Sequence, residues 1–205
     1  MSAGLVRAWQ AQSLLLGYPD EQLYGRLDLL TTAARTLPAP VGEPLLRLLG
    51  HLRGTPPGQA AVDYVATFDN RKRCCLFLTY YQHGDTRNRG MALLELKQTY
   101  AAAGLVLGDD ELPDHLSVML EFASAKPAPG AELLAGHRSG LELLRLALHD
   151  AGSPWAHVVD SVAATLPPLA AQQRTAVERL VSGGPPAERV GLEPFGKHLP
   201  QGVSR

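Results

Sequence analysis

The stretch "VGEPLLRLLGHLRG", residues 41–54, indicates most directly which fold class the chain adopts. Its apolar residues recur at i, i+4, i+7, i+8 and i+11, the spacing that places side chains on one face of an α-helix. These residues are Val41, Leu45, Leu48, Leu49 and Leu52. The apolar-polar alternation typical of a half-buried β-strand is missing over any useful length of the sequence. The sequence therefore predicts an all-α protein.

Helical spacing continues on both sides of this stretch. It predicts one helix over residues 5–16, a second from Asp20 to before Pro38, and a long one over residues 134–151. Thr55 is the predicted N-cap of the helix that follows residue 54. We expect a single helical domain of roughly nine to ten helices over residues 1–182. Residues 183–205 are rich in Gly and Pro and predict an extended tail, in which "VGLEPF" is apolar enough to dock.

Charge and targeting patterns narrow the class of protein. The chain has 19 basic and 20 acidic residues, a balance that gives no reason to expect a nucleic-acid partner. The first residues lack the pattern of a signal peptide, and no apolar run approaches the length of a membrane span. We therefore expect a cytoplasmic protein without membrane insertion.

The residue patterns of catalytic and metal sites are missing from the sequence. Cys74 and Cys75 are adjacent, so on a helix their side chains point about 100° apart and do not face one metal ion. No histidine pair has ligand spacing, and no Gly-rich phosphate loop or Ser nucleophile motif occurs. We expect no enzyme activity, cofactor or metal. A reactive thiol beside the basic residues remains an alternative to packing for the two cysteines.

The stretch "FDNRKRCCLFLTYYQHGDTRNRG", residues 68–90, combines apolar and basic residues. The spacing of Leu76, Phe77, Tyr80 and Tyr81 predicts a short apolar helix between two basic turns. Such a helix suits a groove that binds an amphipathic peptide, and it equally suits an ordinary core with a charged rim. A nucleic-acid patch at residues 71–73 is a third interpretation. The pattern alone leaves these interpretations open.

Two longer segments carry a resemblance to a known family. They are "YVATFDNRKRCCLFLTYYQHGDTRNRGMALLELKQTYAAAGL", residues 64–105, and "ELPDHLSVMLEFA", residues 111–123, and "LLLGYPDE" near the start agrees with them. Together they resemble the nitrate reductase molybdenum cofactor assembly chaperones of the NarJ type, within the redox-enzyme maturation chaperones. The likeness extends from about residue 5 to residue 182.

The resemblance implies an all-helical cytoplasmic chaperone that is not part of the finished enzyme. Its expected partner is the apo catalytic (alpha) subunit of respiratory nitrate reductase, bound through the N-terminal segment. The chaperone would keep that subunit competent for insertion of the molybdenum cofactor and iron-sulfur cluster, with cofactor delivery proteins as further candidate partners. A direct carrier of molybdopterin or of a nucleotide is the alternative.

The residues of the predicted peptide site come from both segments. In the wider family "LPDH", residues 112–115, matches a signature that often begins with Glu, which stands here one place earlier at Glu111. Asp114 is the predicted N-cap of the next helix, and its neighbour His115 is free to reach a partner. The predicted contact residues are Arg71, Arg73, Leu76, Phe77, Tyr80, Tyr81, Asp114, His115 and Leu116.

Overall fold

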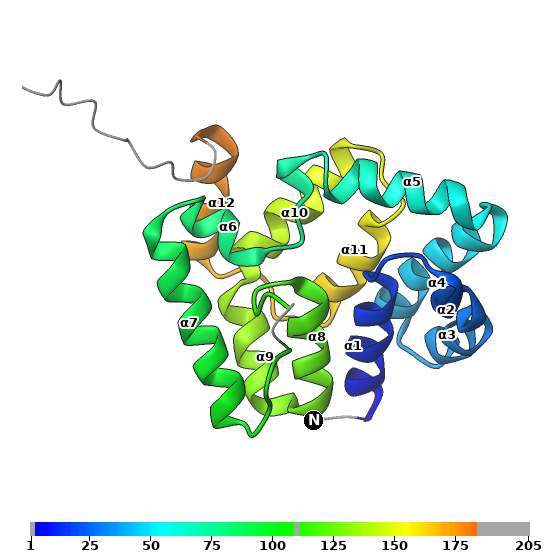
Figure 1. Cartoon of the computed structure of the whole chain (residues 1–205), viewed down its shortest axis with the longest axis horizontal. Helices are drawn as coiled ribbons and strands as arrows, with labels where there is room; N and C mark the ends of the chain where they lie inside the picture. The colour runs from blue at the N-terminus through cyan, green and yellow to red at the C-terminus, as the bar shows by residue number, and fades with distance from the viewer. Residues whose placement is uncertain (1–2, 109–110, 184–205) are drawn as a thin grey trace, which may run out of the picture.

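The computed structural model describes residues 3–108 and 111–183, and within them the chain is all-α, as predicted (Figure 1). Across these residues the structure has twelve α-helices and one short 3-10 helix. In chain order they are α1 (Ala3–Leu15), α2 (Glu21–Gly25), α3 (Leu27–Arg35), α4 (Ala39–Gly54), α5 (Pro57–Phe68), η1 (Lys72–Cys74), α6 (Leu78–His83), α7 (Arg87–Ala102), α8 (Leu116–Ala125), α9 (Pro127–Gly136), α10 (Arg138–Asp150), α11 (Ala156–Ala164) and α12 (Ala171–Gly183). The predicted tail, apart from Gly183, lies outside the described residues.

The core forms where α4 and α1 pack against α11, with α8 on the other side of α1 (Figure 1). The leucine stripe of α4 is fully buried there, as its spacing predicts. Two polar side chains inside this core are hydrogen-bonded: Gln12 Nε2 donates to Ser161 Oγ at 2.8 Å, and Ser161 Oγ donates to the Val41 carbonyl at 2.7 Å. These two hydrogen bonds join α1, α11 and α4, so the three helices have one defined arrangement.

Two helix pairs approach each other closely at a glycine. A Cβ on Gly130 would lie 2.2 Å from Cα of Ala123, where α9 crosses α8. A Cβ on Gly42 would lie 2.4 Å from the Ala34 carbonyl oxygen, where α4 follows α3. Real Cβ contacts are never this short, so both crossings depend on the missing side chain.

Several predicted helix boundaries are wrong. The helix predicted to run from Asp20 to before Pro38 is divided at Arg26, although Asp20 caps its start by accepting from the Leu23 N–H at 2.8 Å. The long helix over residues 134–151 is likewise divided, at His137. Apolar periodicity continues across both divisions, because apolar residues are buried on both sides of each one, such as Leu23 and Leu30 or Leu134 and Leu141.

Thr55 is not the N-cap that the sequence predicts. It follows the last residue of α4, and its hydroxyl donates to the His51 carbonyl of that helix at 2.9 Å. Pro56 precedes α5 instead and makes no side-chain capping bond. A Ser or Thr near a helix junction can therefore bond backward, to the helix it ends. Among the described residues, no helix has both the length and the apolar character required to cross a membrane.

Candidate functional site

Leu76 and Phe77 precede α6, with Phe77 extended, and do not belong to the apolar helix predicted for them. They lie antiparallel to the segment before α8, and Phe77 pairs with His115. The Leu78 N–H donates to the Asp114 carbonyl at 3.0 Å, and the Leu116 N–H donates to the Leu76 carbonyl at 2.9 Å. We call residues 76–78 and 114–116 the bridge. It joins the two segments that carry the family resemblance.

Asp114 is a buried partner within the bridge and not the predicted N-cap of α8. Its carboxylate is fully buried; Oδ2 accepts from the Thr79 hydroxyl at 2.5 Å and lies 3.4 Å from Arg89 Nη2. The N-cap is His115, whose Nδ1 accepts from the Ser117 N–H at 3.3 Å. The prediction failed because the side chain of Asp114 turns to α6 and α7, which supply a hydroxyl and a charge.

His115 packs its ring edge against Phe77, with 5.3 Å between ring centroids. The Arg89 guanidinium lies over the Phe77 ring, 5.6 Å from its centroid. Burial lowers the pKa of His115, and the nearby Asp114 carboxylate opposes that change without reversing it. The imidazole is therefore neutral at pH 7, as its capping role requires.

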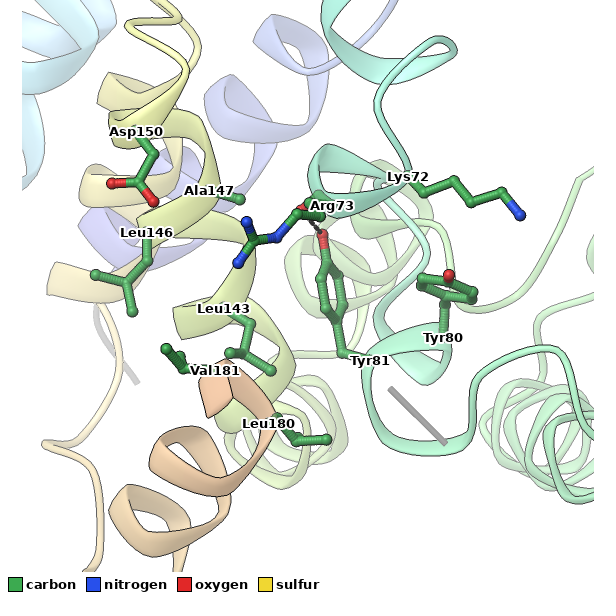
Figure 2. Close-up of a pocket in the computed structure, with 10 residues that line it drawn as sticks. All are labelled: Lys72, Arg73, Tyr80, Tyr81, Leu143, Leu146, Ala147, Asp150, Leu180 and Val181. Carbon is green, nitrogen blue, oxygen red and sulfur yellow. Dashed lines mark hydrogen bonds between the residues drawn. The ribbon is translucent and has the colours of Figure 1, made fainter. Parts of the chain in front are cut away.

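Beside α6 lies a pocket of about 460 Å³, which we call the groove (Figure 2). Three parts of the chain line it: η1 with α6, α10 and α12. Its lining residues are Lys72, Arg73, Tyr80, Tyr81, Leu143, Leu146, Ala147, Asp150, Leu180 and Val181. Most of these side chains are apolar or aromatic, and its charged residues stand near the ends of η1 and α10. Figure 2 shows Arg73 extending toward α10 and Lys72 pointing away from it.

The wall formed by α10 results from apolar residues on two of its sides. Leu141, Leu144 and Leu148 are buried, as their spacing predicts. A second set, at i, i+3 and i+4, faces the groove and comprises Leu143, Leu146 and Ala147. Leu146 is 37% exposed. A leucine this accessible inside a pocket is available to contact a partner.

The wall formed by α6 is held rigidly against α10. At Gly140 a Cβ would lie 2.9 Å from the Leu78 carbonyl oxygen, so the glycine permits the close approach of the two helices. The Tyr81 hydroxyl lies 2.8 Å from the Arg73 carbonyl oxygen and 3.0 Å from that of Cys75. Burial raises the pKa of Tyr81, so its hydroxyl remains a donor to these carbonyls. Tyr81 thereby fixes η1 at the end of the groove.

The cationic end of the groove continues into an adjoining pocket of about 340 Å³. Arg71, Lys72, Arg73 and Asp150 line that second pocket. The three basic side chains are exposed, whereas among the described residues that line this pocket Asp150 supplies the one carboxylate. The combined surface is therefore an apolar floor with a net positive end, which favours a ligand that carries apolar residues and negative charge.

The two cysteines adjoin this surface without forming a reactive site. Cys74 is the last residue of η1, and Cys75 is extended, so the pair does not lie on the single helix that the sequence predicts. Burial raises the pKa of Cys74 more than Arg71 and Arg73 lower it, and burial also raises the pKa of Cys75. Both thiols are therefore protonated at neutral pH, which favours packing over reactivity. Within residues 3–108 and 111–183, no His, Cys, Asp or Glu group of three or more is arranged to hold a metal ion.

Comparison with known proteins gives the family. The model of the nitrate reductase delta subunit family matches residues 34–160, more than half of the chain. The chain belongs to this family. It is 34% identical over 118 residues to the nitrate reductase molybdenum cofactor assembly chaperone NarJ of Escherichia coli, a match that covers 56% of this chain and 50% of that one. The resemblance to NarJ-type chaperones is thus confirmed.

Two further relatives show how far the likeness extends. The nitrate reductase-like protein NarX of Mycobacterium tuberculosis is 40% identical over 158 residues, which is 77% of this chain and 24% of NarX. The chain thus spans about a quarter of NarX and half of NarJ. A solved structure of a candidate redox enzyme maturation protein from Archaeoglobus fulgidus superposes with a TM-score of 0.62 and 23% identity, covering 80% of this chain and 94% of that one. That likeness supports the fold.

The residues predicted for the family's peptide site fall into three groups. Arg73, Tyr80 and Tyr81 line the groove, and Arg71 lines the adjoining pocket. Leu76, Asp114 and Leu116 are buried in the bridge. Phe77 and His115 are half-buried on the surface of the bridge.

Sequence reasoning missed the α10 and α12 walls of the groove. The signal for α10 was present, because residues 143, 146 and 147 form a second apolar set at helical spacing beside the buried set Leu141, Leu144 and Leu148. For α12 the residues at the groove, Leu180 and Val181, lie at the end of a helix whose packing partner the sequence does not identify.

Proposed function

We propose that this protein is a chaperone that binds the apo catalytic subunit of a nitrate reductase through that subunit's N-terminal segment. It holds the subunit competent for insertion of the molybdenum cofactor and iron-sulfur cluster and for assembly with its partner subunits. The proposal places the protein in the cytoplasm, where it acts without catalysing a reaction, and cofactor delivery proteins meet the complex there. Two findings support the proposal: the chain belongs to the nitrate reductase delta subunit family, and it is similar to the assembly chaperone NarJ.

The observation that carries the proposal is the groove with its positive end. A helical peptide presents apolar side chains at i, i+3, i+4 and i+7, and such a stripe fits against Leu143, Leu146 and Tyr80. An acidic residue near one end of the peptide would lie beside Arg73. The part of the groove from η1 and α6 comes from residues 64–105, within the segment that carries the family resemblance.

Calorimetric titration with a synthetic N-terminal peptide of the cognate catalytic subunit tests the proposal. We expect a Kd of about 1 to 10 μM, which a helix-in-groove contact readily supplies. Leu146→Lys places a charge in the groove, and we expect it to weaken binding at least about tenfold, because the charge loses water without gaining a partner.

The matched control is Leu29→Lys. Leu29 is 69% exposed on α3 and does not line the groove, so this substitution adds the same charge elsewhere and should leave the affinity unchanged. Absence of heat and of complex at about 100 μM peptide would contradict peptide binding. Equal weakening by the two substitutions would show that binding uses another surface.

A further inference from the structure

The chain that follows α12 starts at the groove. Leu180 and Val181 in the last turn of α12 line it, and α12 ends at Gly183. At least 22 residues follow, 184–205, and they include the segment "VGLEPF" at residues 190–195. Any segment at this place in the sequence is tethered next to the groove by the helix itself.

We propose that residues 190–195 dock in the groove of their own chain and compete there with the reductase peptide. The docking itself depends only on the groove and the segment. The competition rests on the proposed function. The occupant is thus a named part of this chain, with its tether fixed by α12.

The composition of the segment matches the two parts of the groove. Val190 and Leu192 supply apolar contact for the floor formed by α10 and α12, and Phe195, on the other side of an extended chain, supplies it for the aromatic side formed by Tyr80 and Tyr81. In an extended chain, residues two apart point to the same side, so Val190 and Leu192 face the floor together. Pro194 favours that extended conformation in the residue before it.

The negative charge of the segment matches the positive end of the groove. Glu193 follows Leu192 and points to the opposite side of an extended chain, away from the apolar floor. On that side it meets the exposed Arg73, which extends toward α10 at the positive end of the groove (Figure 2). An exposed pair of this kind adds little affinity but sets the orientation of the segment.

The residues between α12 and the segment act as a tether, and the length of this tether makes even weak docking effective. Six residues lie between Gly183 and Val190, and the seven steps from one Cα to the next span at most about 25 Å when fully extended. Short flexible tethers of this size give an effective concentration of about 1 mM. If the free segment bound with a Kd of about 100 μM, tethering would occupy the groove about nine-tenths of the time and lower the apparent affinity of a competing peptide about tenfold.

The test uses the full chain and changes only the segment. The double variant Leu192→Asp with Phe195→Asp removes two apolar contacts, and Leu199→Asp with Val203→Asp is the matched control with the same added charge. Methyl resonances of Leu143, Leu146, Leu180 and Val181 report occupancy of the groove without any reductase peptide. Calorimetry with that peptide then reports competition.

We expect the double variant, and not the control, to shift these groove methyl resonances and to raise the affinity for the peptide about tenfold. Unchanged methyl resonances in the double variant would overturn the proposal, whatever the peptide does. Shifts that depend on protein concentration would also overturn it, because they would show docking into a second copy of the chain. Shifted resonances with no peptide binding in any variant would sustain the docking and refute the proposed function instead.

Discussion

The bridge and the groove meet at α6 but differ in how much solvent reaches them. In the bridge Leu76, Asp114 and Leu116 are almost completely buried, and Asp114 Oδ2 accepts a hydrogen bond from the Thr79 hydroxyl of the same chain. In the groove Leu146 is 37% exposed and Tyr80 is half-buried. The residues predicted for one peptide site therefore have different roles in the bridge and in the groove. Changes in the bridge should lower stability, whereas changes in the groove should lower affinity at nearly constant stability.

The largest loss of stability is expected for Leu116→Ala. Leu116 is completely buried, so its truncation removes buried methyl groups and leaves a cavity. We expect the free energy of unfolding to fall by about 3 kcal/mol, within the range of buried leucine truncations. Urea denaturation followed by circular dichroism measures it. The control is Leu112→Ala, four residues earlier and 43% exposed, which should change stability by less than about 0.5 kcal/mol. Similar losses in both variants would contradict the structural role of the bridge.

Asp114→Ala should cost less, about 2 kcal/mol. The substitution removes the acceptor for the buried Thr79 hydroxyl and the partner of Arg89. A fully buried ion pair would cost more to break, but the Arg89 side chain is 20% exposed and keeps Asp85 at 3.6 Å. The same urea experiment measures the loss.

Asp85→Ala is the control for the Asp114 variant. Its side chain is 68% exposed, so its ion pair with the same arginine should contribute no more than about 0.5 kcal/mol. If Asp114→Ala were as mild as Asp85→Ala, the carboxylate would not be the buried link between the two segments.

A comparison of α4 with Asp114 shows what can and cannot be predicted from the sequence. Apolar periodicity predicted the all-α class and the buried face of α4, because those depend on neighbours within one turn or two. It misplaced Asp114, because the choice between capping α8 and bonding Thr79 depends on a contact 35 residues away. It likewise missed the break at His137, where apolar spacing continues although α9 and α10 are separate helices.

The binding residues divide in the same way. Arg73, Tyr80 and Tyr81 were found because the basic and aromatic residues stand close together in the sequence. Leu143 and Leu180 come from two other helices, and only the packing of α10 against α6 and α12 brings them to the same pocket. A local pattern can identify one wall of a groove, but the opposite wall requires the tertiary structure.

A change between the bridge and the groove should have an intermediate effect. Gly140→Ala adds a Cβ 2.9 Å from the Leu78 carbonyl oxygen and 3.5 Å from Cβ of Tyr81. Because the neighbouring backbone must shift, we expect a net loss of about 1 kcal/mol, together with weaker peptide binding from the displaced α6. Urea denaturation and peptide calorimetry measure the two effects.

Gly50→Ala is the control for the Gly140 variant. Gly50 lies in α4 with open space around its Cβ position, so alanine should stabilise the protein by about 0.5 to 1 kcal/mol through helix propensity. Stabilisation by Gly140→Ala of the same size would show that α6 and α10 are not in close contact.

The smallest effect is expected from protonation of His115. Because burial lowers its pKa in the folded protein, the unfolded chain binds a proton first as the pH falls below the usual histidine pKa of about 6.5. Its contribution to stability is therefore complete above that pH and declines below it. Asp114 limits the decline, since its charge opposes the effect of burial. His115→Asn retains a cap for the Ser117 N–H but does not titrate, so its free energy of unfolding should fall less than that of the unaltered protein between pH 7 and pH 5. Urea titrations at each pH give the two slopes. Parallel slopes would show that folding does not lower the pKa of His115, and so that its imidazole is not buried against Phe77 in the bridge.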